Sequence, residues 1–333
     1  MNVHDLPTPA LVVDRRALEN NLGAMAAALP GPRLRPHVKA HKTTALARLQ
    51  AAAGHHNFTC ATPREVEGMA RAGLGDDLLL ANEVVDDDRL ARLAALDARV
   101  TVAVDSDATI DAAARNGISE VLIDVNVGLP RCGCDPGDAG RLADAARARG
   151  LGVRGVMGYE GHVVGVEDRA ARVEQTAVAM ELLTKAHADT GGDLVSAGGT
   201  GTYDINTWAN EIQAGSYVLM DGAYDKLALP FRPGLSISAT VVSVSPGWVV
   251  ADCGLKALGM DHGNPTVSGG TVWFCSDEHL TFSPDGGDGS MRVGDRVTVW
   301  PAHIDPTIAY HERMQVVDGD EVVETWEVDL RGW

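Results

Sequence analysis

The chain has 333 residues, of which 45% are hydrophobic and 5% aromatic, and this length allows a large core and two domains. The formal net charge of -18 gives a surface that repels phosphate backbones, which argues against nucleic acid as a partner. No apolar run approaches membrane-spanning length, and the N-terminus lacks the features of a signal peptide. Because the five cysteines are scattered, we expect a cytoplasmic protein with reduced thiols.

Short strand-like runs alternate with alanine-rich stretches of helical spacing from residue 33 to about residue 222. Eight strands that alternate with helices predict a parallel (β/α)₈ TIM barrel over residues 16–235. A doubly wound sheet is the alternative, but no early strand is followed by a G-x-G-x-x-G turn. The eight runs are "RLRPHVKA", "NFTCAT", "DDLLLAN", "VTVAVDS", "EVLIDVNV", "GVRGVMGYEG", "DLVSAGGTG" and "IQAGSYVLMD".

The pattern changes after about residue 235. Apolar and polar residues there alternate in runs that are separated by Pro-Gly, Gly-Gly and Asp-Gly turns, which is typical of antiparallel strands. The sequence therefore predicts a C-terminal antiparallel β domain over residues 236–333. The early run at residues 7–15 has no partner to spare in the barrel, and we expect it to join this β domain.

The stretch "RLRPHVKAHKTT" at residues 33–44 concentrates basic groups at the end of the first predicted strand. His37, Lys39 and His41 alternate, so on a strand they would share one face, and barrel active sites form at this end of the strands. A lysine that faces a barrel interior is costly unless it is used or paired, and its amine can form an imine. A basic surface cluster is the alternative interpretation of this segment alone.

Two loops of small residues follow the seventh and eighth predicted strands. They are "SAGGTGTY" at residues 196–203 and "IQAGSY" at residues 212–217. Barrels commonly hold a phosphate with backbone N–H groups at these two places. Together with a lysine on the first strand, the loops indicate a phosphate-bearing cofactor that forms an imine, which is pyridoxal 5′-phosphate.

These motifs, with "DVNVGLPRCG" and "GYEGH", resemble the pyridoxal-phosphate enzymes of the alanine racemase fold, in the branch of D-threonine aldolases and D-serine dehydratases. The resemblance runs from about residue 6 to the C-terminus. It implies that Lys39 is the Schiff-base lysine, that Arg131 lies near the cofactor and that Tyr159 packs beside its ring. It places Gln213 near the pyridine nitrogen. The residues it implies for the phosphate are Thr200, Gly201, Gly215 and Ser216.

The segment "WPAHIDPT" at residues 300–307 holds a candidate metal pair. His303 and Asp305 are two residues apart on a strand-like run, so both side chains would point the same way and share one divalent cation. A solvated pair is the alternative for H-x-D by itself. The resemblance implies metal ligands at this position, with H-x-D and a harder cation in aldolases and H-x-C and zinc in dehydratases. We expect Mn²⁺, with Mg²⁺, Co²⁺ and Zn²⁺ as alternatives.

The resemblance implies an aldehyde-lyase that cleaves a small β-hydroxy D-amino acid, D-threonine for example, into glycine and an aldehyde. The candidate bases for the hydroxyl proton are His162 and a hydroxide on the metal, although His162 also fits a loop histidine with backbone partners. The open alternatives are a D-serine or D-3-hydroxyaspartate dehydratase, a D-3-hydroxyaspartate aldolase and a non-catalytic cofactor carrier. The resemblance also implies a homodimer.

Overall fold

A computed structural model describes all of residues 1–333. The chain forms two compact units, each assembled from segments that are distant in the sequence. The barrel unit comprises Met25–Lys39, Leu46–Gly215 and Leu330–Trp333. The β unit comprises Met1–Ala24, Ala40–Ala45 and Ser216–Asp329. None of the helices has both the length and the apolar character that crossing a membrane requires.

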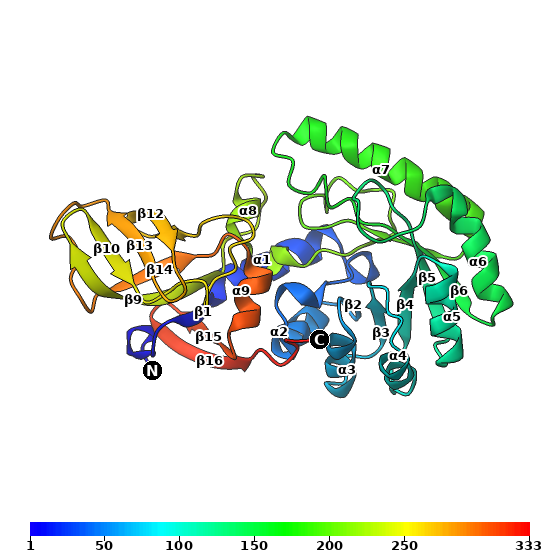
Figure 1. Ribbon diagram of the computed structural model, residues 1–333, viewed down its shortest axis with the longest axis horizontal. Helices are drawn as coiled ribbons and strands as arrows, with labels where there is room; N and C mark the ends of the chain where they lie inside the picture. Colours follow the sequence, from blue (N-terminus) through cyan, green and yellow to red (C-terminus); the bar gives the residue numbers. More distant parts are fainter. The chain divides into compact units, whose positions relative to one another are not determined.

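The barrel unit contains a sheet of seven parallel strands that are neighbours in chain order, from β2 to β8. Helices follow most of these strands and lie along their outer side in Figure 1. The strands are β2 (Asn57–Cys60), β3 (Asp77–Leu80), β4 (Val100–Val104), β5 (Glu120–Asp124), β6 (Gly152–Met157), β7 (Leu194–Ala197) and β8 (Glu211–Ile212). The helices are α2 (Thr44–Ala52), α3 (Pro63–Arg71), α4 (Asp87–Ala94), α5 (Asp107–Arg115), α6 (Ala139–Ala148) and α7 (Arg169–Thr190).

The first predicted strand forms no regular strand, but it joins the two edges of this sheet. Arg35 donates its backbone N–H to Ile212 of β8 at 2.9 Å, and Thr59 of β2 donates to Pro36 at 2.9 Å. Pro36 has no N–H, so a continuous ladder cannot form through it. The predicted barrel is therefore present, with seven regular strands and one irregular segment that closes it.

The middle strands of the barrel unit are buried along their whole length. Every residue of β3 and β4 is buried, as expected for parallel strands that are covered on both faces. Leu79, Ala103, Leu122 and Met157, from the four consecutive strands β3 to β6, pack into one cluster. This continuous apolar layer fixes the strands that carry the candidate site residues.

A network of buried charges lies near the amino ends of the strands. The Arg35 guanidinium donates to Glu211 at 2.8 Å and to Asp77 at 3.2 Å. Arg154 donates two hydrogen bonds to the same Asp77 carboxylate, at 2.8 and 2.7 Å. Burial by itself raises the pKa of Asp77, but Arg154 and Arg35 outweigh it and lower the pKa to about 2. The carboxylate is therefore charged, and its charge is fully compensated.

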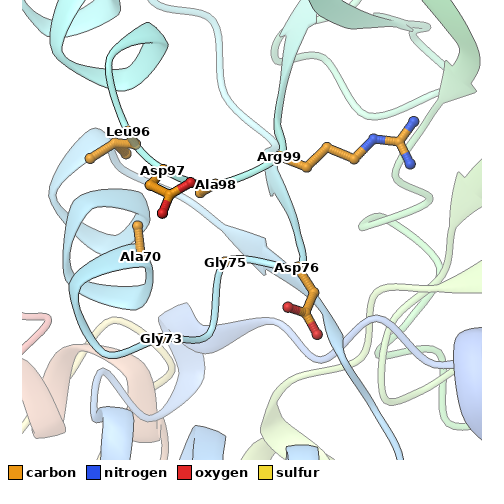
Figure 2. A pocket seen from close by; sticks show the side chains of 8 residues that line it. All are labelled: Ala70, Gly73, Gly75, Asp76, Leu96, Asp97, Ala98 and Arg99. Carbon is orange, nitrogen blue, oxygen red and sulfur yellow. The ribbon is translucent and has the colours of Figure 1, made fainter.

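A solvent-open pocket of about 560 Å³ lies at the amino ends of β3 and β4, and Figure 2 shows its lining. Active sites of such barrels form at the opposite, carboxyl end, where Lys39 follows the first segment. The one arginine in the pocket, Arg99, is already paired with Glu120 at 2.7 Å. We therefore assign the pocket no part in the chemistry. Its lining consists of Ala70, Gly73, Gly75, Asp76, Leu96, Asp97, Ala98 and Arg99.

The β unit is built on a nine-stranded, mostly antiparallel sheet, in which β1 lies between β9 and β15. Along β9, buried and partly exposed residues alternate from Leu235 to Val241, the pattern of a strand with one covered face. The strands are β1 (Ala10–Asp14), β9 (Leu235–Ser245), β10 (Trp248–Ala251), β11 (Thr266–Val267), β12 (Gly270–Cys275), β13 (Leu280–Pro284), β14 (Arg296–Trp300), β15 (Arg313–Asp318) and β16 (Glu321–Glu327). The helices are α1 (Arg15–Ala28), α8 (Gly222–Asp225) and α9 (Ile304–Tyr310).

Replacing Asp77 with Asn is expected to lower the free energy of unfolding by about 3–5 kcal/mol, because Arg154 would lose its paired carboxylate and Arg35 would keep only Glu211. Urea unfolding measures the difference, with Asp76→Asn as the matched exposed neighbour. The pKa of Asp77 lies below its ordinary 3.8 in the folded chain. Its contribution to stability is therefore present above pH 3.8, and the difference between wild type and variant should shrink as the pH falls toward 2. An unchanged stability in Asp77→Asn would contradict this role of the network.

Candidate active site

Lys39 lies in a short 3-10 turn, Val38–Ala40, at the carboxyl end of the irregular first segment. Its neighbours Val38 and Ala40 are fully buried, while Lys39 itself is partly exposed. The expected strand alternation of His37, Lys39 and His41 is wrong, because the turn replaces the strand before it reaches Lys39. The lysine nevertheless stands at the end of the barrel where active sites form.

Arg131 and Tyr159 lie together. The guanidinium carbon of Arg131 lies 5.5 Å from the centre of the Tyr159 ring, in a cation–π arrangement. A Cβ atom added at Gly161 would overlap the Tyr159 ring, and one added at Gly199 would lie 3.4 Å from it. Tyr159 therefore connects the loop after β6 to the glycine loop after β7.

Glu160, a fully buried residue, holds the glycine loop after β7 in place. Its carboxylate accepts hydrogen bonds from the Gly198 N–H at 3.1 Å, the Thr202 hydroxyl at 2.8 Å and the Asn206 amide at 3.1 Å. Three donors on one buried carboxylate compensate its burial. They also fix the conformation of residues 198–206, which include the predicted phosphate contacts Thr200 and Gly201.

Gly201 is the tightest position in this loop. A Cβ atom there would overlap the carbonyl oxygen of Val164, so only glycine allows the loop to approach that backbone. The fit supports the predicted role of the loop as a phosphate cradle, in which backbone N–H groups close to the ligand replace side chains. Gly215 ends the barrel unit, and Ser216 begins the short 3-10 helix Ser216–Val218 of the β unit.

Gln213 and His162 differ in how firmly they are held. The Gln213 side chain donates to the buried Ser196 hydroxyl at 2.8 Å, and its backbone N–H donates to Ala197 at 3.0 Å. Its amide is therefore oriented from the neighbouring strand β7. His162 is exposed, and its ring packs on Gly128, where a Cβ atom would lie 2.7 Å from the imidazole Cε1. Gly128 therefore leaves room for the candidate base.

Sequence reasoning missed a group of carboxylates at the carboxyl ends of β3 to β5. Asp124 ends β5, Glu83 follows β3 and Asp105 follows β4. Burial, together with Glu83, raises the pKa of Asp124 well above its ordinary value. The hydrogen bond to Glu83, with burial, raises the pKa of the Cys132 thiol to about 11, so it is no nucleophile at neutral pH. The signal available was an acidic residue in, or directly after, each of three predicted strands.

In the β unit, His303 and Asp305 lie next to each other, although not on a strand. His303 immediately precedes α9, and Asp305 is in its first turn. The expected strand geometry is wrong, but the helical turn still places the His303 Nε2 atom 3.9 Å from an Asp305 carboxylate oxygen. Both side chains are mostly buried, and a nitrogen and an oxygen donor at this separation suit a shared divalent cation.

A third residue fixes the orientation of the His303 ring. Its Nδ1 atom lies 2.7 Å from an Asp261 carboxylate oxygen, and the ring of His262 stacks on it with centroids 3.9 Å apart. The possible ligand atoms of Asp261, His262 and His303 lie within 4.8 Å of one another, which is close enough to hold a metal. A separation of 2.7 Å is, however, that of a direct hydrogen bond, which keeps the proton on Nδ1 and leaves the Nε2 lone pair facing Asp305.

One buried oxygen atom beside this pair supports a cation there. Asp221 is 3% exposed, and its Oδ1 atom is buried without a hydrogen-bond partner. Burial raises the pKa of Asp221 to about 6, with the charge of Asp305 adding to the shift and His303 opposing it. A divalent cation would satisfy both carboxylates, so the residues present fit the implied metal.

The fold is that of the alanine racemase class, with a barrel that carries a lysine after its first segment and an added β domain. Residues 13–222 match the family described as "Alanine racemase, N-terminal domain", and residues 234–317 match the "Putative serine dehydratase domain".

The chain is 34% identical to the 3-hydroxy-D-aspartate aldolase of Paracoccus denitrificans, over 100% of this chain and 94% of that protein. It is 33% identical to the D-threonine aldolase of an Arthrobacter species, over 98% and 93%. The crystal structure of D-threonine aldolase from Filomicrobium marinum superimposes with a TM-score of 0.92 at 33% identity, over 99% and 97%. The chain therefore belongs to the alanine racemase-fold family, in the branch of these D-amino acid aldolases, and the resemblance inferred from the motifs is confirmed.

Replacing Gly201 with Ala is expected to weaken pyridoxal-phosphate binding by 10-fold or more, about 1.4 kcal/mol, because the new methyl group collides with Val164. Dialysis followed by cofactor absorbance measures how much cofactor the protein retains. Gly165→Ala is the matched control, since no atom lies within 4 Å of its added Cβ. If both variants retain the cofactor equally, the glycine loop does not contribute to cofactor binding.

Proposed function

We propose that the protein is an aldehyde-lyase that cleaves a β-hydroxy D-amino acid, with D-threonine giving glycine and acetaldehyde. The similarity to two aldolases over the whole chain carries the choice of reaction. The H-x-D pair at His303 and Asp305 favours it further, because a carboxylate suits a harder cation than a thiolate would.

Pyridoxal phosphate would be held by residues of the glycine loops and by Lys39. The Lys39 amine would bind the aldehyde carbon, and Tyr159 with Arg131 would pack beside the ring. Gln213, fixed by Ser196, would face the pyridine nitrogen. When bound, the cofactor supplies an electron sink for the electrons of the broken Cα–Cβ bond. The residues assigned to the phosphate are Thr200, Gly201, Gly215 and Ser216.

His303 and Asp305 would hold a divalent cation, which acts as a Lewis acid toward the substrate hydroxyl. Asp261 supports this role because it keeps the His303 Nε2 lone pair available at the Asp305 side. The same pair could hold Mn²⁺, Mg²⁺, Co²⁺ or Zn²⁺. We propose Mn²⁺ because one of the two protein donors is a carboxylate. A variant of the Delftia D-threo-3-hydroxyaspartate dehydratase has been solved in a metal-free form, so a metal is relevant in a relative.

The proton movements are assigned to two residues. His162 accepts the proton of the β-hydroxyl, and the Cα–Cβ bond breaks as the aldehyde C=O bond forms. Lys39 then delivers one proton to Cα, which gives glycine. The exposed position of His162 leaves its imidazole accessible to a substrate hydroxyl.

Elimination is the second candidate reaction, and similarity to a dehydratase favours it. The chain is also 27% identical to a D-threo-3-hydroxyaspartate dehydratase from a Delftia species over 98% of both proteins. In that reaction Lys39 would remove the Cα proton and hydroxide would leave. Two aldolase substrates remain candidates, D-threonine and D-3-hydroxyaspartate. The relatives named for them are nearly equally identical to this chain.

We extend the proposal to a homodimer in the cytoplasm. The cytoplasmic assignment rests on five free cysteines, which suit a reducing compartment. The homodimer rests on the resemblance to this fold class, and light scattering of the purified protein measures it.

Product identity tests the reaction. Incubated with D-threonine, the cofactor- and Mn²⁺-loaded enzyme is expected to release glycine and acetaldehyde in equal amounts. With D-3-hydroxyaspartate, the expected products are glycine and glyoxylate. Formation of 2-oxobutanoate or oxaloacetate with ammonia would make the protein a dehydratase, and turnover of neither substrate would contradict the proposal.

Replacing His162 with Gln is expected to lower kcat by about 10²- to 10⁴-fold with little change in KM, because a general base acts in the transition state. Retained cofactor absorbance shows that the site is intact. His56→Gln, at an exposed histidine of the same unit, is the matched control. A kcat that falls less than 3-fold would assign the base to another group.

A further inference from the structure

We propose that Asp221 is a third residue of the cation site, and its second carboxylate, beside His303 and Asp305. This inference rests on the cation assigned above and names a residue that the H-x-D motif does not contain. All three residues belong to the β unit. Asp221 is 82 residues before His303 in the sequence, so no local spacing connects them.

Asp221 occupies a helix-capping position without capping the helix. It directly precedes α8, where an aspartate side chain commonly accepts a backbone N–H of the first turn. Its side chain makes no such capping hydrogen bond. The side chain therefore does not serve as a regular N-cap of the helix that it precedes.

Backbone contacts place Asp221 against the metal-ligand segment instead. Gly222 donates its N–H to Pro301 at 3.2 Å, and Ala223 donates to Ala302 at 3.2 Å. The Ile304 N–H, between the two candidate ligands, points to Asp221 Oδ2 at 3.5 Å. This distance is at the limit for a hydrogen bond, so it compensates little of the carboxylate's burial.

The other carboxylate oxygen, Oδ1, is the observation that indicates a ligand. This atom is buried and has no hydrogen-bond partner. The whole residue is buried as well, with 3% of its surface exposed. A buried carboxylate oxygen without a hydrogen-bond partner is unfavourable, and the nearby Asp305 adds like-charge repulsion. A divalent cation removes both penalties at once. One imidazole and two carboxylates are also a donor set that suits a hard cation such as Mn²⁺.

Direct Mn²⁺ binding tests the proposal without any need for catalysis. The full-length enzyme is stripped of metal with a chelator, and free Mn²⁺ is measured by electron paramagnetic resonance during titration. Asp221→Asn is expected to weaken Mn²⁺ binding about 10- to 100-fold. The matched control is Asp225→Asn, an exposed aspartate in the same helix, for which less than a 2-fold change is expected.

Thermal unfolding supplies a second readout. Without metal, Asp221→Asn should melt at the same temperature as wild type or higher, because an unfavourable buried charge has been removed. With saturating Mn²⁺, its rise in Tm should be smaller than that of wild type. A lower Tm without metal, combined with unchanged Mn²⁺ affinity, would give Asp221 a structural role only. If Asp221→Asn fails to fold, Asp221→Ser serves for the same titration.

His303→Ala separates this inference from the proposed function. If His303→Ala loses Mn²⁺ while Asp221→Asn binds as tightly as wild type, the role of Asp221 is overturned and the metal pair stands. If His303→Ala also binds Mn²⁺ as wild type does, the cation site itself is wrong, and the Asp221 proposal falls with it. If both variants bind weakly, the three-residue site is supported.

Discussion

The buried guanidinium of Arg35 is the interaction on which the barrel unit depends. The segment that closes the barrel contains Pro36, which cannot donate a backbone hydrogen bond, so the side chain of Arg35 supplies much of the connection. It joins Glu211 at the start of β8 to Asp77 at the start of β3. Because Lys39 lies four residues further along, the charge network at one end of this irregular segment helps to place the candidate cofactor lysine at its other end.

In both halves of the candidate chemistry a carboxylate fixes the geometry by accepting hydrogen bonds; Glu160 is buried and Asp261 is exposed. Glu160 holds the glycine loop through three hydrogen bonds, and Asp261 orients His303 through one. In each case the carboxylate that fixes the geometry is a different residue from the one that would contact the cofactor or the cation. Fixed donors reduce the conformational freedom that ligand binding would otherwise remove.

Asp221 differs from these carboxylates because its Oδ1 atom has no donor. Asp77, by contrast, is buried with two arginines and has a pKa of about 2. Burial raises the pKa of both residues, but Asp77 accepts hydrogen bonds from two arginines, whereas Asp221 faces one histidine and the like charge of Asp305. The proposed cation site rests on this buried oxygen atom without a donor, beside an imidazole and a second carboxylate.

The sequence alone determined the fold class and most of the candidate residues, because strand and helix periodicity, glycine loops and short motifs such as H-x-D are local patterns. Local patterns did not predict the 3-10 turn at Lys39 or the helical position of Asp305, since Pro36 and the packing of α9 override strand-like composition. Only the tertiary structure brought Glu160 under the glycine loop, Asp261 to His303, and Asp221 to the ligand segment. These contacts join residues up to 83 positions apart, and hydrogen bonds over such separations depend on how the chain folds back, which no local spacing encodes.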